Sequence, residues 1–120
     1  MTFDIVARAK ALADLLDAHP QTKAYHDPAK ALANRPCLLV LPPTVDHTEG
    51  SFTGPEVTWR IAAVSSFGAL TLDALKEIQK LLEAAREVLD VERETPARYT
   101  FGPDGKNVAA AYLCTHTEIA

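Results

Sequence analysis

The first twenty residues carry apolar side chains at the spacing of one helical face. The stripe has intervals of four, three and four residues and is widened by three neighbours: Ile5, Ala9, Leu12 and Leu16, with Val6, Ala13 and Leu15. Polar residues fall on the other side: Lys10, Asp14 and Asp17. The pattern predicts an amphipathic helix capped by Thr2, with Asp4 in its first turn, that ends near His19-Pro20.

A second helical pattern begins after Thr71, which we expect to be its N-cap. Its apolar stripe is Leu75, Ile78, Leu82, Ala85 and Leu89, broadened by Ala74, Leu81 and Val88. The solvent side offers three opposite-charge pairs at i,i+3 spacing, which would each add a few tenths of a kcal/mol: Asp73–Lys76, Glu77–Lys80 and Glu83–Arg86. This stretch is the clearest helix of the chain.

Between the two helices lie two strand-like blocks. Residues 37–41 are continuously apolar, which is typical of a strand covered on both faces, and Pro36 and Pro42-Pro43 bracket them. Residues 57–65 alternate, with one face formed by Val57, Trp59, Ile61 and Ala63. The two blocks predict an antiparallel hairpin with a long tip.

The tip, residues 43–55, is polar from Thr44 to Gly54 except for Val45 and Phe52. Loops of this length in small domains are commonly functional or disordered. We expect residues 44–54 to be mobile in the isolated subunit and to become ordered against a partner. The candidate protein-interface residues are therefore Val45, Asp46, His47, Glu49 and Phe52.

Two more strands are predicted at residues 91–101 and 108–119, joined by a turn at 102–107 that contains two glycines. Pro96 indicates a bend or a sheet edge in the first of them. Residues 23–26 fit a short edge strand, and residues 29–34 fit either a helical turn or a loop.

These elements give the order α-β-β-α-β-β in one domain, residues 1–120. Because each helix has one apolar face, the economical packing is an α+β two-layer sandwich. We expect a four-stranded antiparallel or mixed sheet with two helices on one face.

Composition narrows the classes of function. The chain has 120 residues, is 48% hydrophobic and carries a net charge of −4 without a basic cluster, which disfavours direct nucleic-acid binding. No window approaches the roughly 18 apolar residues of a membrane span. The start, Met1-Thr-Phe-Asp, lacks the features of a signal peptide, so we expect a cytoplasmic protein without membrane contact.

Residues that could carry chemistry are scattered. Histidines and acids occur at His26-Asp27 and at Asp46-His47-Thr48-Glu49, without the spacing of a metal site. Cys114 and His116 share a strand face but lack an orienting acid. Both Cys114 and Cys37 lie in apolar runs, where buried thiols are favoured over a disulfide. We therefore expect no enzyme, no catalytic residue, no cofactor and no metal.

Several features in one order resemble the tail terminators of long-tailed, siphovirus-type bacteriophages, of the kind carried by phages of actinobacteria. After the N-terminal helix come Lys23-Ala-Tyr-His-Asp-Pro and the strand Arg35-Pro-Cys-Leu-Leu-Val-Leu-Pro-Pro-Thr. A strand around Trp59-Arg60 and the long Leu-rich helix follow. Glu94-Thr-Pro-Ala-Arg-Tyr and Ala111-Tyr-Leu close the chain, so the resemblance covers most of it.

The resemblance implies a structural virion protein with the small α/β sandwich of such terminators. It would be assembled in the host cytoplasm as a hexameric ring on the finished tail tube, which stops growth of the tube and joins the tail to the head-completion (stopper) protein. Genomic DNA would pass through the ring without specific binding, which a mild negative charge suits.

Two alternatives stay open. The chain could be a small ligand-binding or regulatory module with a pocket near Trp59 and Tyr112, although Trp59 fits core packing better. It could also be another phage neck protein, a stopper or an adaptor, although the order of elements argues mildly against this.

Overall fold

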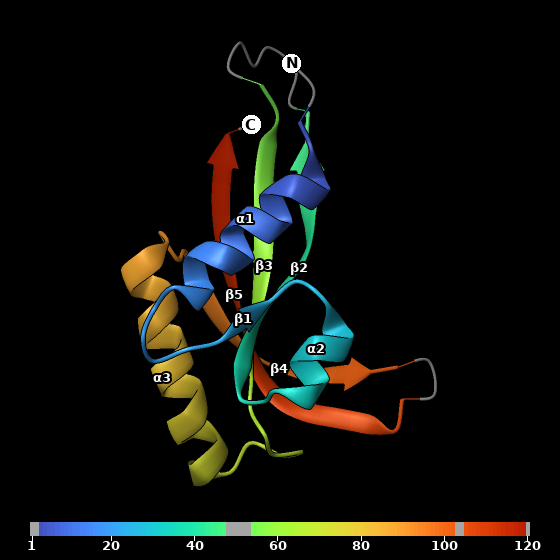
Figure 1. Cartoon of the computed structure of the whole chain (residues 1–120), viewed down its shortest axis with the longest axis vertical. Coiled ribbons are helices and arrows are strands. Elements are labelled where there is room, and N and C mark those ends of the chain that lie inside the picture. The colour runs from blue at the N-terminus through green and yellow to red at the C-terminus, as the bar shows by residue number, and fades with distance from the viewer. Residues whose placement is uncertain (1–2, 48–53, 103–104, 120) are drawn as a thin grey trace.

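The computed structural model describes residues 3–47, 54–102 and 105–119. Its elements follow in the order α1 (Ile5–Asp17), β1 (Ala24–Tyr25), α2 (Pro28–Ala33), β2 (Cys37–Asp46), β3 (Glu56–Val64), α3 (Leu72–Val88), β4 (Arg93–Phe101) and β5 (Asn107–Ile119). The molecule is elongated, 46 × 33 × 22 Å, and β2, β3 and β5 run along its length (Figure 1).

The strands form one mixed sheet in the order β1-β2-β3-β5-β4. β1 is parallel to β2, and the other neighbours are antiparallel. Because directly opposed residues on neighbouring strands share a face, the register places Val40, Ile61 and Cys114 in one row on one face.

Helices α1 and α3 cover that face. The core beneath them is built around fully buried side chains of the two helices and of β3: Leu12, Leu16, Trp59, Ile61 and Ile78. The opposite face has a second core, in which Ala31 of α2 packs with Cys37, Leu39, Val64 and Phe101. Helix α2 also contacts β4, so the far strand bends back to help cover this face.

The prediction of α+β architecture is confirmed, but four strands and two helices are too few. The described residues form five strands and three helices; α1 and α3 share one face of the sheet, and α2 lies on the other. The extra strand is the short segment expected near Tyr25, and residues 28–33 form a helix. Asp27 caps that helix by accepting a hydrogen bond from the Ala29 N–H at 3.0 Å, with Pro28 in its first turn.

The prediction that Pro42-Pro43 end the first long strand is wrong. Strand β2 runs on to Asp46, with a register shift between Leu41 and Thr44 where the prolines lie. Because β1 pairs only with Leu38 and Leu39, this later part of β2 is a sheet edge, and a missing N–H is tolerated there. Thr44 and its next two neighbours therefore belong to a strand and not to the predicted loop.

Two details of the helices also differ from the prediction. Asp4, and not Thr2, caps α1, since its Oδ1 accepts a hydrogen bond from the Ala7 N–H at 3.0 Å; Thr2 lies outside the described residues. Val6 and Leu15 are 74% and 48% exposed, so they do not belong to the buried stripe. Thr71 caps α3 as predicted, with Ala74 as donor.

The three ion pairs predicted along α3 are absent from the described residues. Glu77 instead accepts hydrogen bonds from Ser66, and Arg86 binds Glu94 of β4 at 2.5 and 2.6 Å. The helix therefore uses these charges to reach neighbouring segments and not its own next turn. No helix in the described ranges is long and apolar enough to span a membrane.

Candidate interaction surfaces

The part of the sheet beyond the second core forms an arm: Thr44–Asp46 of β2, Glu56–Arg60 of β3 and Thr115–Ile119 of β5. Helix α1 crosses one face of the arm (Figure 1). Glu118 fixes the helix to it: Arg8 donates two hydrogen bonds to the Glu118 carboxylate at 2.8 Å, and the indole Nε1 of Trp59 donates a third at 3.0 Å. The helix, the middle strand and the last strand thus meet at one carboxylate.

His116 extends this cluster. One ring nitrogen lies 3.3 Å from the Glu118 carboxylate and the other 3.0 Å from the Asp90 carbonyl oxygen, which follows α3. Hydrogen bonds from the Arg8 guanidinium lower the pKa of Glu118 to about 2, against partial burial that acts in the other direction. Glu118 is therefore a charged anchor whose oxygens are occupied, and it is poorly suited to act as a catalytic base.

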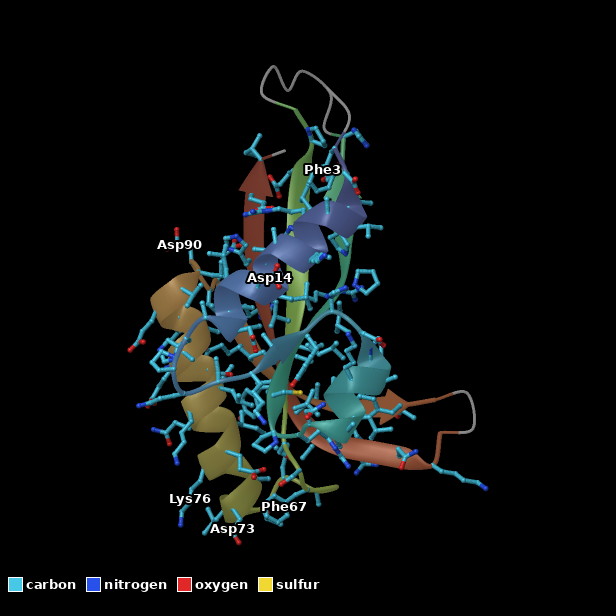
Figure 2. The ribbon with its side chains drawn as sticks, in the orientation of Figure 1. Phe3, Asp14, Phe67, Asp73, Lys76 and Asp90 are labelled. Carbon is cyan, nitrogen blue, oxygen red and sulfur yellow. The ribbon has the colours of Figure 1, made fainter. Side chains whose placement is uncertain are left out.

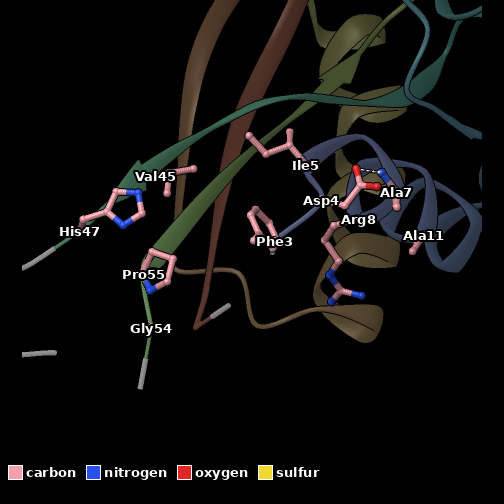
Figure 3. Close-up of a pocket in the computed structure, with 10 residues that line it drawn as sticks. All are labelled: Phe3, Asp4, Ile5, Ala7, Arg8, Ala11, Val45, His47, Gly54 and Pro55. Carbon is pink, nitrogen blue, oxygen red and sulfur yellow. Dashed lines mark hydrogen bonds between the residues drawn. The ribbon is translucent and has the colours of Figure 1, made fainter. Parts of the chain in front are cut away.

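An apolar groove lies at the hairpin end of the molecule, where β2 and β3 approach each other. It lies between the start of α1 and the two strands, and its lining includes Phe3, Ile5, Val45, His47 and Pro55 (Figure 3). Val45 packs against the main core, whereas Ile5 is 43% exposed. The structure thus brings two of the five predicted interface residues, Val45 and His47, to one surface.

The remaining interface candidates do not join this groove. Asp46 opposes Glu56 on the other face of the arm, because neighbouring residues in a strand point to opposite sides. Glu49 and Phe52 lie outside the described residues, so the predicted mobility of that segment remains a prediction. The candidate site is split between two faces of the hairpin.

A second apolar surface lies at the opposite end, in the segment that connects β3 to α3. All residues from Ser66 to Asp73 are exposed, and four large apolar side chains lie here: Phe67 (39% exposed), Leu70 (44%), Leu72 (77%) and Leu75 (36%). We call these four residues the α3-end patch. Figure 2 shows Phe3 and Phe67 at opposite ends of the long axis.

The α3-end patch is held in place by defined hydrogen bonds. Ser66 donates through its N–H and its hydroxyl to the Glu77 carboxylate at 2.8–2.9 Å, and the Phe67 carbonyl accepts from the Ala110 N–H at 2.8 Å. Exposed apolar groups on an ordered backbone are a feature of interaction sites. The sequence did carry a signal for this surface: Leu70 and Leu72 lie outside the apolar stripe that Leu75 begins.

The groups with potential reactivity are used structurally. Cys114 and His116 share a strand face, yet Cys114 donates to the Ile61 carbonyl at 3.3 Å while His116 contacts Asp90 and Glu118. Burial raises the pKa of Cys114 to about 12 and that of Cys37 to about 11, so both thiols are protonated at neutral pH. Both cysteines are free and buried, as predicted.

The other polar candidates are dispersed. His26 is exposed, and the Asp27 carboxylate caps α2. Across the described parts of the chain, three or more histidines, cysteines or acids never gather in a way that could hold a metal ion. Trp59 is fully buried and its N–H is bound by Glu118, which leaves no stacking surface for the ligand pocket that we considered near Tyr112.

Comparison with known proteins adds no relative: the chain matches no protein-family model and no curated protein sequence.

Proposed function

We propose that this chain is a structural subunit of a long-tailed bacteriophage, a tail terminator that forms a hexameric ring on the completed tail tube. The proposal begins from the sequence resemblance, in which the elements occur in the order of such terminators. It assigns the chain no catalysis and no cofactor. Its work is assembly, which depends on surfaces and not on a reaction centre.

One structural observation carries the proposal: ordered apolar side chains are exposed at both ends of a subunit 46 Å long. The hairpin-end groove and the α3-end patch are different surfaces, and each subunit of a closed ring presents two different surfaces to its two neighbours. The polar groups that might have supported chemistry, Glu118 and the two thiols, are committed to the core and to α1.

The sheet edges favour contacts through side chains over pairing between strands. The free edge of β2 carries Pro42 and Pro43, and β4, at the other edge, carries Pro96. Proline cannot donate to a ladder, and prolines at sheet edges limit strand addition. A ring built from this subunit would therefore join its copies mainly through side chains exposed at its two ends and not through strand pairing.

In this role the ring would contact the tail tube protein on one side and the head-completion protein on the other. The genome would pass through its opening, and a subunit with a net charge of −4 would not hold the phosphate backbone. The site of action would be the head–tail junction of the virion, after assembly in the host cytoplasm.

Electron microscopy of intact particles tests this directly. We expect six copies of the chain in one ring between the uppermost tail-tube ring and the head-completion protein. Disruption of its coding sequence should give tails of irregular length that are not joined to heads. A single copy, a five-fold or twelve-fold ring, or a position on the head side in place of the stopper would contradict the proposal.

A further inference from the structure

A row of three exposed side chains crosses the tip of the arm. Asp46 of β2 opposes Glu56 of β3, and Glu56 opposes Ile119 of β5, so the three share one face. We call them the acidic row. Among the described residues neither carboxylate has an ion-pair or hydrogen-bond partner. Like charges directly opposed across strands repel each other, so the isolated subunit carries an uncompensated negative pair.

A row of opposite charge lies on α3. Leu72, Lys76 and Lys80 follow one another at i, i+4 and i+8 and so lie along one side of the helix, and all three are exposed. We call them the basic row. Lys76 and Lys80, together with Lys23 from the segment before β1, line one hollow.

Four basic side chains, Lys23, Arg35, Lys76 and Lys80, line this hollow against two carboxylates, Asp17 and Glu77, and these carboxylates are hydrogen-bonded elsewhere. Asp17 accepts a hydrogen bond from the Ala24 N–H at 3.0 Å, and Glu77 is bound by Ser66. In the described part of the chain, Lys76 and Lys80 make no ion pair. The hollow therefore presents a local positive charge on a protein that is acidic as a whole.

The two rows match in order and in length. Each has two like charges followed by one apolar side chain. Neighbouring strands are about 4.8 Å apart, so the acidic row spans about 10 Å, and eight residues of helix rise about 12 Å. The acidic row lies where β2 and β5 end and β3 begins, and the basic row lies in the first half of α3. Figure 1 shows this end of the three strands and the start of α3 at opposite ends of the molecule, so the rows cannot meet within one copy.

We infer that the acidic row of one copy binds the basic row of the next copy, with Asp46 and Glu56 facing Lys80 and Lys76 and with Ile119 against Leu72. The partner is a second copy of this chain, because it carries the complementary charges at the complementary spacing. Such a contact joins two different surfaces and so generates a ring or a filament. The inference rests on the proposed ring function and identifies the contact that would close it.

Charge reversal tests the pairing. One variant carries Asp46→Lys and Glu56→Lys, and the other carries Lys76→Glu and Lys80→Glu. In an equimolar mixture the two variants can alternate. The reversed row of one variant then faces the reversed row of the other, and the intact rows also face each other, so every contact joins a positive row to a negative row. The measurement is association by sedimentation equilibrium at low salt, across protein concentrations up to about the millimolar range at which weak contacts become populated.

We expect the natural chain to associate, and its association to weaken as salt rises, because exposed charges are screened. Each variant alone should associate at least about tenfold more weakly, since 1.4 kcal/mol of lost attraction corresponds to a factor of ten. The mixture should recover the association of the natural chain. Matched controls at exposed sites outside both rows, Lys30→Glu with Arg98→Glu and Asp14→Lys with Glu92→Lys, should leave association unchanged.

Three results would overturn the inference: a natural chain that stays monomeric over the whole range, variants that associate normally, or a mixture that does not recover. Loss of binding to a short DNA duplex on reversal of Lys76 and Lys80, without copy association, would assign these lysines to phosphate instead. A particle map distinguishes the failure of this inference from the failure of the proposed function. A hexameric ring whose copies are joined through other residues would contradict the inferred contact and still support the tail-terminator function.

Discussion

The two halves of the long sheet are built differently although the same three strands run through both. In the first half of β2, Cys37 to Val40 are all buried, because α1 and α3 cover one face while α2 and the bent end of β4 cover the other. In the arm, only α1 covers the sheet, and burial alternates: Val57 and Trp59 are buried, whereas Glu56 and Arg60 are exposed.

This difference separates stability from function in the proposed subunit. The double-covered half buries both faces and supplies the rigid base, whereas the arm needs Glu118 to hold its one helix and leaves its other face free. A surface that makes contacts must stay out of the core, and in the arm Glu56 and Arg60 are exposed on the face that α1 does not cover. The predictions below probe this division.

The largest effect should come from the buried face that only the first half possesses. Leu39→Ala removes a fully buried side chain from the second core and should cost about 2–5 kcal/mol in the free energy of unfolding. Thr44→Ala lies on the same face of the same strand, within the arm, and should change it by less than about 0.5 kcal/mol. Urea unfolding of both variants measures the contrast, and equal losses would contradict the division.

The next effect concerns the anchor of the arm. Glu118→Gln removes the charge that Arg8 and Trp59 bind and should cost about 1–3 kcal/mol, because hydrogen bonds to a charged group contribute more than neutral ones. Hydrogen exchange should also increase in α1 more than in α3. Glu92→Gln is the matched control, since Glu92 is exposed and its side chain has no described partner. An equal increase of hydrogen exchange in α1 and α3 would show that Glu118 does not specifically anchor α1.

The same anchor predicts a dependence of stability on pH. The pKa of Glu118 falls from its ordinary value of 4.5 to about 2 in the folded chain. Its contribution is therefore complete above pH 4.5 and is lost as the pH falls from there toward 2. Unfolding measured at pH 6, 4 and 3 should show a loss of up to about 1.4 kcal/mol per pH unit from this group. Glu118→Gln should make the free energy of unfolding depend less on pH over this range. If the variant and the natural chain lose stability in parallel as the pH falls, other acids such as Glu94 cause the dependence.

The smallest effect is expected from chemical labelling of the thiols, because the reagent cannot reach them while the core is closed. Cys37 and Cys114 are fully buried with raised pKa values, so a thiol reagent at neutral pH should modify neither in the native protein and both in denaturant. A mass two protons lighter than the thiol form would reveal a disulfide. Cys37 packs in the second core and Cys114 in the first, so each reports the opening of one face.

Much of the fold follows from local pattern. The alternation of Val57, Trp59 and Ile61 placed three side chains on one face correctly, and Thr71 capped α3 as expected. The continuous apolar run that begins at Cys37 predicted a strand covered on both faces, and the structure confirms this. Such features depend on residue period and on hydrogen bonds between near neighbours, which sequence carries directly.

The errors came from contacts between distant segments. Pro42 and Pro43 end a strand only if that strand is central, and the shortness of β1 made this part of β2 an edge. Arg86 and Glu77 found partners outside their own helix because β4 and Ser66 lie beside it.

The sequence by itself determined the two long helices and the four long strands, and it predicted correctly that both thiols are free and buried. Only the tertiary structure decided which apolar residues stay exposed. Val6 fits the apolar stripe of its helix, yet it stays exposed, as do Phe67 and Leu72, because no element among the described residues covers them. The register of the sheet also decided that Asp46, Glu56 and Ile119 share one face. The spacing of residues along the chain specifies the apolar period of each helix and strand. A surface, in contrast, forms only where segments distant in the sequence are brought together.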